Sequence, residues 1–494
     1  MGDQLLSAVV HVFTLQTVAG ILAGTFIGLI IGALPGLTAT MGMALLSPLT
    51  YFLDPLVGIP FLIGLYKGGT YGGTISAVLI GTPGTASNAA TVLDGYVMAR
   101  RGEGGRALKA SLNSALIGDV IGSLALIFGA PLVAKVALHF GPSEFFALTV
   151  FSLTMVCYVS GTSLAKGLLA ATIGMLAALI GVDPIGGSQR LTFGVEPLKS
   201  GINVIALVIG AFALSEVLVQ MERMTDKRAV ARGLVELGHS TLRLAEMVPF
   251  LRNIIRSSLV GTLIGALPGI GAETSNWVAY GLAKRASKHP EEFGKGTLEG
   301  VVAPEAAANA VCGAAMVPML TFGIPGDIVT AIMLGAFIAQ GLIPGPFLIE
   351  KNPTLFYGLF MTVLMATVAL WFLGSLTQRY FVRVLNTPAA LLYPIIVVLC
   401  VGGTYAVNSS MFDVFVMLGF GVLGYGMRKL DVPIPPMVLA FILSKLIEDS
   451  LRRALVHANG NVLELVSRPT TAVILLLAVA VLGAIIWKSR TATH

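Results

Sequence analysis

The sequence predicts an all-α polytopic membrane protein, and three observations support this fold class. Of the 494 residues, 55% are hydrophobic and only 11% are charged, whereas soluble domains are about 25% charged. The mean hydropathy is +0.88. Apolar stretches long enough to cross about 30 Å of hydrocarbon recur along the whole chain, for example at 117–138, 164–182, 202–219, 356–373 and 472–487. A soluble fold is therefore excluded, and we expect roughly eleven or twelve membrane segments, several of them broken.

Charge and cysteine usage narrow the function classes. The formal net charge is +6, but no dense Lys/Arg block with interleaved aromatic residues is present, so we interpret the charge as a topology signal and expect no nucleic-acid partner. Cys157, Cys312 and Cys400 lie in apolar surroundings without CxxC spacing, which indicates neither a disulfide framework nor a zinc site. The amino terminus lacks a basic region followed by a small-residue cleavage site, so no removed signal peptide is expected.

The chain contains an internal repeat. Residues 28–36, Gly-Leu-Ile-Ile-Gly-Ala-Leu-Pro-Gly, match residues 261–269, Gly-Thr-Leu-Ile-Gly-Ala-Leu-Pro-Gly. Residues 81–84, Gly-Thr-Pro-Gly, match residues 323–326, Gly-Ile-Pro-Gly. Because both motifs recur in the same order, they predict two related halves. These are residues 1–235, with motifs at 28–40 and 66–96, and residues 236–494, with motifs at 261–276 and 303–330.

Lysine and arginine predict that the two halves have opposite orientations, because cytoplasmic loops collect positive charge. Between its two motifs the first half has one lysine and the second half has four basic residues, and after the second motif the imbalance reverses. The residues concerned are Lys67, against Lys284, Arg285, Lys288 and Lys295, and then Arg100, Arg101, Arg106 and Lys109, against Lys351. This is the signature of an inverted-topology repeat, on which many secondary transporters are built. The boundary is expected in the polar, cytoplasmic stretch 221–246, which holds Arg223, Lys227, Arg228 and Arg232.

Proline and glycine interrupt apolar stretches at matched points of the two halves. Pro35-Gly36 corresponds to Pro268-Gly269, and Pro83-Gly84 corresponds to Pro325-Gly326. Backbone groups freed by such a break cost several kcal/mol each in lipid, so the breaks must be buried or solvated. A single Pro-Gly would be interpreted as a kink or turn. Four at symmetric positions favour a site at the bilayer midplane, where half-helix N-termini face an anion and unwound carbonyl groups hold a coupling cation such as Na⁺.

Small polar residues follow each break and form the candidate solute site, because hydroxyl, amide and backbone groups suit an anion and its cation. Lys67 either attracts a carboxylate or extends to the membrane interface. Asn88 and Asn276 are expected to contact solute or cation without being needed for folding. The candidate substrate-binding residues are Gly36, Thr38, Thr40, Lys67, Thr82, Pro83, Gly84, Thr85, Ser87, Asn88, Gly269, Gly271, Thr274, Ser275, Asn276, Pro325 and Gly326.

Ionisable residues within apolar segments are further candidates, for coupling to a cation. Glu305 and Asn309 share one helical face next to Pro304, although a carboxylate at a helix N-terminus is an alternative interpretation. Glu273 and Asp327 follow breaks and either bind a cation or only cap the next helix. The cation-coupling candidates are Glu273, Glu305, Asn309, Asp327 and Thr330. Glycines spaced by four, from Gly20 to Gly36 and from Gly261 to Gly269, are interpreted as helix-packing positions.

At these motifs the sequence resembles the TctA family, the large membrane subunit of the tripartite tricarboxylate transporters, over nearly the whole chain. The motifs are Gly-Ala-Leu-Pro-Gly-Leu-Thr-Ala-Thr-Met-Gly at 32–42, Tyr-Lys-Gly-Gly-Thr-Tyr-Gly-Gly-Thr-Ile-Ser-Ala at 66–77 with 81–85 and 93–96, and Pro-Glu-Glu-Phe-Gly-Lys-Gly at 290–296 with 303–307. The chain departs from the family pattern at Thr38 and Gly81, where glycine and asparagine are common, at Ala308, where a second asparagine is typical, and at Glu273-Thr274, where glycines often occur. These departures concern the substrate and not the architecture.

The resemblance implies a permease of the bacterial inner membrane that works with a small TctB-like membrane subunit and a periplasmic TctC-like solute-binding protein. It implies import of a di- or tricarboxylate driven by a sodium or proton gradient, with no cofactor besides the coupling ion. It also implies an architecture like that of the ion-transporter superfamily, with re-entrant hairpins and elevator-type movement.

Two other function classes are weighed against a secondary transporter. An intramembrane hydrolase is disfavoured because the sequence has no HExxH, no GxSxG and no evident Ser/His pairing. The absence of GxxxxGK[ST] likewise argues against ATP hydrolysis by this chain. We therefore expect the protein not to be an enzyme. A passive anion channel would share the broken helices and stays an alternative.

Overall fold

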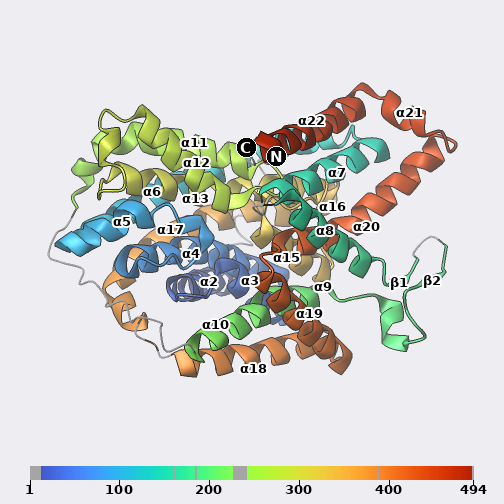
Figure 1. The fold of residues 1–494 in the computed structure, drawn as a ribbon, viewed down its shortest axis with the longest axis horizontal. Coiled ribbons are helices and arrows are strands. Elements are labelled where there is room, and N and C mark those ends of the chain that lie inside the picture. Colours follow the sequence, from blue (N-terminus) through green and yellow to red (C-terminus); the bar gives the residue numbers. More distant parts are fainter. Residues whose placement is uncertain are drawn as a thin grey trace.

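The structure is a computed structural model that describes residues 13–159, 163–183, 186–225, 242–385, 387 and 389–491. Helices make up most of these residues (Figure 1). Within the described ranges, strands are limited to the antiparallel hairpin of β1 (Gly181–Val182) and β2 (Gln189–Arg190). Of the predicted boundary stretch 221–246, residues 226–241 lie outside the described residues, and with them Lys227, Arg228 and Arg232.

The helices follow in an order that recurs in the two halves. The first half contains α2 (Leu15–Ala33), α3 (Ala39–Leu46), α4 (Pro55–Ile80), α5 (Val92–Met98), α6 (Gly104–Ala137), α7 (Pro142–Val159), α8 (Leu164–Ala178), α9 (Val204–Val208) and α10 (Ser215–Thr225). The second half contains α11 (Leu251–Gly265), α12 (Gly271–Ala286), α13 (Glu299–Ala314), α14 (Met316–Phe322), α15 (Ile328–Ala339), α16 (Leu348–Lys351), α17 (Pro353–Val384), α18 (Ala389–Asn408), α19 (Met411–Lys429), α20 (Ile434–His457), α21 (Val462–Ser467) and α22 (Pro469–Thr491).

Many of these helices suit a bilayer. Among the described residues, seven are long and apolar enough to cross a membrane, namely Leu15–Ala33, Val92–Ala137, Val204–Glu222, Glu299–Phe322, Pro353–Gln378, Ala390–Asn408 and Met411–Lys429. Four shorter apolar helices are Pro142–Cys157, Leu164–Ala178, Ile328–Ala339 and Pro469–Gly483. The prediction of an all-α multi-pass membrane protein is confirmed. The inverted orientation of the halves and the elevator movement stay predictions.

Two central helices, α4 and α13, are buried along almost their entire length. Every residue from Gly58 to Leu79 is buried, and so is every residue from Gly300 to Ala314. A helix that is buried on all sides belongs to the core of a large membrane protein. Because neighbouring helices cover both of them completely, any polar side chain that they carry must find its partners inside the protein.

The glycine series packs helices onto these two central helices, as predicted. A Cβ atom added at Gly24 would lie 2.0 Å from the carbonyl oxygen of Phe61, and one at Gly32 would lie 2.3 Å from that of Gly69, so α2 contacts α4 backbone to backbone. In the second half, a Cβ at Gly261 would lie 2.2 Å from the carbonyl oxygen of Ala307, so α11 contacts α13 in the same way. Close approach of this kind stabilises helix pairs in lipid through van der Waals contact.

All four predicted helix breaks are present. The first break separates α2 from α3 and its counterpart separates α11 from α12, while the other two follow α4 and α14. The matched glycines share a backbone conformation, with φ of +86° at Gly36 and +84° at Gly269, and +69° at Gly81 and +72° at Gly323. Glycine adopts this left-handed region without steric cost, which is why it ends these helices.

A buried carboxylate joins the two halves next to these breaks. One oxygen of Asp94, on α5, accepts hydrogen bonds from the backbone N–H groups of Gly294, Gly296 and Thr297, at 2.9, 2.8 and 3.0 Å. The other oxygen accepts a hydrogen bond of 2.9 Å from the hydroxyl of Tyr280 on α12. A carboxylate held by several donors fixes the loop before α13 against α5.

Replacing Asp94 with alanine is expected to lower the free energy of unfolding by about 3 kcal/mol, because three backbone donors lose a charged acceptor. Tyr280→Phe removes one donor and should cost only about 1 kcal/mol. Unfolding by titration with sodium dodecyl sulfate would measure both. Equal stability of Asp94→Ala and the wild type would show that other contacts hold this loop.

Candidate functional site

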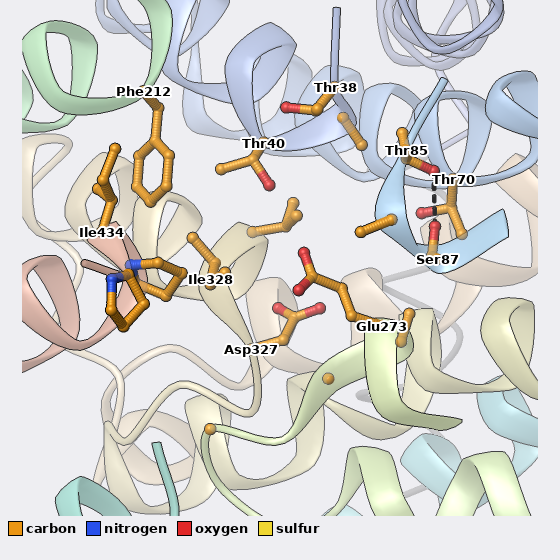
Figure 2. Close-up of a pocket in the computed structure, with 18 of the residues that line it drawn as sticks. Thr38, Thr40, Thr70, Thr85, Ser87, Phe212, Glu273, Asp327, Ile328 and Ile434 are labelled. Carbon is orange, nitrogen blue, oxygen red and sulfur yellow. Dashed lines mark hydrogen bonds between the residues drawn. The ribbon is translucent and has the colours of Figure 1, made fainter. Parts of the chain in front are cut away.

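The four breaks meet at one cavity of about 370 Å³, a volume typical of small-molecule sites. Figure 2 shows Thr40, Glu273 and Asp327 pointing into this space from three different elements. The segments that line the cavity directly after the breaks are 38–40, 85–87, 269–273 and 327–329. Segments as far apart in sequence as the ends of α2 and α14 are therefore brought to a single polar space.

Some of the predicted site residues line this cavity and others lie behind it. Those that line it are Thr38, Thr40, Thr85, Ser87, Gly269, Gly271, Glu273 and Asp327. Those that are not among its lining residues are Gly36, Lys67, Thr82, Pro83, Gly84, Asn88, Thr274, Ser275, Asn276, Glu305, Asn309, Pro325, Gly326 and Thr330. Direct solute contact is thus supported geometrically for the first set, whereas the second set acts through its neighbours.

Three helices begin at the cavity, namely α3, α12 and α15. The Thr38 side chain caps α3 by accepting a hydrogen bond of 3.1 Å from the backbone N–H of Met41. Asp327 caps α15 by accepting hydrogen bonds from the backbone N–H and the hydroxyl of Thr330, both 2.8 Å long. Helix N-termini carry free N–H groups and partial positive charge, so this arrangement attracts an anion. The capping interpretation of Asp327 is confirmed, and the same carboxylate also faces the cavity.

The charged groups of the cavity are mixed in sign. The carboxylates of Glu273 and Asp327 face the same space (Figure 2). The Tyr66 hydroxyl donates a hydrogen bond to Asp327, while the Glu273 carboxylate has no hydrogen-bond or ion-pair partner among the described residues. Arg428 also lines the cavity and forms an ion pair of 2.5 Å with Glu216. A free anion would meet two carboxylates here, so a bound cation or proton must offset their charge.

Neither predicted role of Lys67 matches its position. Its side chain is 1% exposed, so it does not extend to the membrane interface, and it does not line the cavity. The ammonium group instead forms an ion pair of 2.8 Å with Asp119 on α6. It also donates to the Val363 carbonyl at 2.8 Å and to the Thr367 hydroxyl at 2.7 Å, both on α17. Complete burial of α4 forces this, since a lysine there must find its partners inside the protein.

Asn276 positions the cavity wall instead of facing the solute. Its amide N–H groups donate to the carbonyl oxygens of Ala86, Ala272 and Glu273, at 3.2, 3.1 and 2.7 Å. Its amide oxygen accepts a hydrogen bond of 3.3 Å from the Ala90 N–H. Asn276 therefore ties the first turn of α12 to the segment after the second break, and these contacts argue that it matters for folding as well.

The two breaks within each half also touch each other. In the second half, the Gly269 N–H donates a hydrogen bond of 2.8 Å to the Gly326 carbonyl. In the first half, Gly84 lies directly against the Gly32 carbonyl, where an added Cβ would stand only 1.9 Å from the oxygen. Each pair of breaks thus forms one compact unit beside the cavity. This explains why Gly84 and Gly326 are required although neither lines the cavity.

Sequence reasoning missed part of the cavity wall. Tyr66 and Thr70, one helical turn apart on α4, face the cavity, although only Lys67 was chosen from this segment. The N-terminus of α20 was also missed, although Pro433, Pro435 and Pro436 mark a further proline-rich interruption. The remaining lining residues are Ala39, Ala86, Phe212, Ile270, Ala272, Ile328, Val329, Arg428, Val432 and Ile434, and most of these carry no polar signal.

Comparison with known proteins connects this architecture to one family. Residues 18–439 match the model of the tripartite tricarboxylate transporter TctA family. An uncharacterized 52.8 kDa protein in the TAR-I ttuC' 3' region of Agrobacterium vitis is 35% identical over 457 residues, which are 92% of this chain and 90% of that protein. An uncharacterized protein in the TAR-II ttuC' 3' region of the same organism is 37% identical over 215 residues, which are 44% of this chain and 89% of that protein. No solved structure matches the chain significantly. The chain therefore belongs to the tripartite tricarboxylate transporter TctA family.

Proposed function

We propose that this TctA-family membrane protein is the permease subunit of a secondary transporter that imports a small organic anion, a di- or tricarboxylate, together with sodium ions or protons. A periplasmic solute-binding protein delivers the anion, and a small membrane subunit completes the complex in the bacterial inner membrane. The meeting of four helix breaks at one polar cavity carries this proposal. Such paired breaks are the structural basis of solute sites in secondary transporters.

The cavity offers complementary groups for both an anion and a cation. The N-termini of α3, α12 and α15 provide partial positive charge. The carboxylates of Glu273 and Asp327 hold a sodium ion or a proton, whose charge then compensates the carboxylate of the solute. Binding of the anion and of the cation each makes the other more favourable, which is the thermodynamic basis of coupling.

Movement is expected to be of the elevator type, with the breaks carried as one unit. The compact contacts between the breaks within each half, at Gly32 with Gly84 and at Gly269 with Gly326, support rigid movement of these segments. Inverted-topology halves would provide two related states that face opposite sides of the membrane. A passive channel is the alternative, since open carbonyl groups at helix breaks also suit ion conduction.

Uptake by the purified protein in proteoliposomes tests the proposal. Radiolabelled citrate, malate and succinate are supplied outside, while sodium and proton gradients are imposed separately. Accumulation of one of these carboxylates above its outside concentration supports coupled transport. Flux that only follows the concentration gradient of the solute would instead indicate a channel.

Thr40→Val is expected to weaken uptake without affecting folding. The Thr40 side chain lines the cavity and points toward the two carboxylates (Figure 2), so its hydroxyl is available to the solute. Valine has nearly the same shape, and losing one hydrogen bond should raise the half-saturating concentration by about tenfold. Thr172→Val on the exposed face of α8 is the control. Unchanged uptake by Thr40→Val would place the solute elsewhere.

A further inference from the structure

Glu305 lies behind the cavity in a fully buried pocket of neutral donors. Its side chain is 0% exposed and belongs to α13, in the centre of the protein. One carboxyl oxygen accepts hydrogen bonds from the Thr91 hydroxyl at 2.5 Å and from the Asn88 amide at 3.2 Å. The other oxygen accepts a hydrogen bond of 2.6 Å from the Thr74 hydroxyl. None of these partners carries a charge.

No positively charged group compensates Glu305 in the described part of the chain. The ionisable side chains on the helices around it that have other partners are Lys67 with Asp119, Arg106 with Glu246, Arg256 with Asn253, Tyr280 with Asp94, Tyr66 with Asp327, and Tyr71 with the Leu108 carbonyl. The others are Glu273 in the cavity wall, Glu299 at the start of α13, Tyr96 on α5, and the exposed Lys109, Lys135, Arg252, Lys284 and Arg285. An ionised carboxylate that is fully buried without a cation is costly, so Glu305 favours binding a proton.

The same pocket can hold Glu305 in both of its protonation states. Hydroxyl groups donate and accept equally well, so Thr74 and Thr91 can donate to a carboxylate or accept from a protonated carboxyl group at the same distances. The buried amide oxygen of Asn309, one turn along α13, has no hydrogen-bond partner among the described residues. An acceptor is therefore still unused close to this group.

A short chain of polar groups connects Glu305 with the solute cavity. Thr85 and Ser87 line the cavity, and both hydroxyls donate hydrogen bonds to the amide oxygen of Asn88. The amide nitrogen of Asn88 in turn donates to Glu305 and, at 2.8 Å, to Thr74. A solute that binds Thr85 or Ser87 therefore competes for the groups that orient Asn88, and through Asn88 it changes the donors around Glu305.

We propose that Glu305 binds and releases the proton that is transported with the solute, and that Asn88 links its protonation to occupancy of the cavity. The inference rests on the proposed function and chooses protons over sodium as the coupling ion. A proton from the outside forms an O–H bond with the Glu305 carboxylate when the solute is bound. That bond breaks after the solute has left on the cytoplasmic side, and the proton leaves to the cytoplasm.

Glu305→Gln in proteoliposomes tests this proposal, because glutamine resembles a permanently protonated carboxyl group. We expect the variant to keep the exchange of radiolabelled citrate for internal citrate, which needs no net proton movement, and to lose accumulation driven by a proton gradient. Glu299→Gln, at the start of the same helix and outside the hydrogen-bond network, is the matched control and should accumulate citrate as the wild type does. Proton-driven accumulation by Glu305→Gln, or wild-type accumulation on a sodium gradient alone, would overturn the proposal.

Infrared spectroscopy gives a second test that does not depend on transport or on a known solute. The wild type should show the carbonyl stretching band of a protonated carboxyl group, which is absent in Glu305→Gln. Thr91→Val removes one hydrogen-bond donor and should shift this band, so the assignment holds even if Glu305→Gln fails to fold. A wild-type spectrum without the band, or with a band unaffected by either variant, would contradict a proton on Glu305. Complete absence of citrate flux in the wild type would count against the proposed function, and the infrared result would then decide alone on Glu305.

Discussion

Replacing Lys67 with methionine is expected to destabilise the protein by about 3–5 kcal/mol, because the change leaves Asp119 buried without its ionic partner. Both side chains are almost completely buried, at 1% and 0% exposure, and their ion pair is 2.8 Å long. Lys67 also holds α17 through Val363 and Thr367, so three helices lose a common contact. We expect low yield of folded protein and a lower midpoint of unfolding in detergent.

Asp119 provides the matched test of this ion pair. Asp119→Leu alone should be about as harmful as Lys67→Met, because it leaves an ammonium group buried. The double variant Lys67→Met/Asp119→Leu removes both charges and should recover much of the stability, since apolar replacements of a buried ion pair are often neutral. If Lys67→Met alone unfolds like the wild type, the ion pair is not needed for stability, and a role in transport becomes the better explanation for its burial.

Gly84→Ala is expected to abolish transport and to destabilise the protein by about 3 kcal/mol, because the break after α4 has no room for a methyl group. The added Cβ would lie 1.9 Å from the Gly32 carbonyl oxygen and 2.9 Å from the Gly73 Cα. Both neighbours are backbone atoms, which cannot turn away as a flexible side chain can. The hairpin would therefore separate from α2, and the residues that line the cavity after Gly84 would move with it.

Gly281→Ala is the control for this substitution. Gly281 lies within α12, and no atom stands within 4 Å of its added Cβ. Alanine loses less conformational entropy than glycine in a helix, so this variant should be up to about 1 kcal/mol more stable. Comparable uptake and comparable unfolding midpoints of Gly84→Ala and Gly281→Ala would show that close contact at the break is not needed.

Much of the fold could be predicted from the sequence because the signals are local. Long apolar stretches predict membrane helices wherever they occur. Proline and glycine end a helix through their own backbone properties, so the breaks near Gly36, Gly81, Gly269 and Gly323 were predictable from single positions and their repetition. The motif resemblance likewise depended on short continuous segments.

The partners of individual side chains depended on how distant helices pack. Lys67 and Asp119 are 52 residues apart, and Tyr66 and Asp327 are 261 residues apart. Sequence reasoning placed Asn88 among the solute contacts because it follows a break, but the rotation of this segment turns Thr85 and Ser87 to the cavity and Asn88 toward Glu305.

The sequence by itself therefore determined that this chain is a helical membrane protein of the TctA family with four matched helix breaks. Only the tertiary structure decided which polar groups meet at the cavity and which lie behind it. The physical reason is that a helix break arises from the backbone of one or two residues, whereas the direction and partner of a side chain depend on the rotation and contact of whole helices.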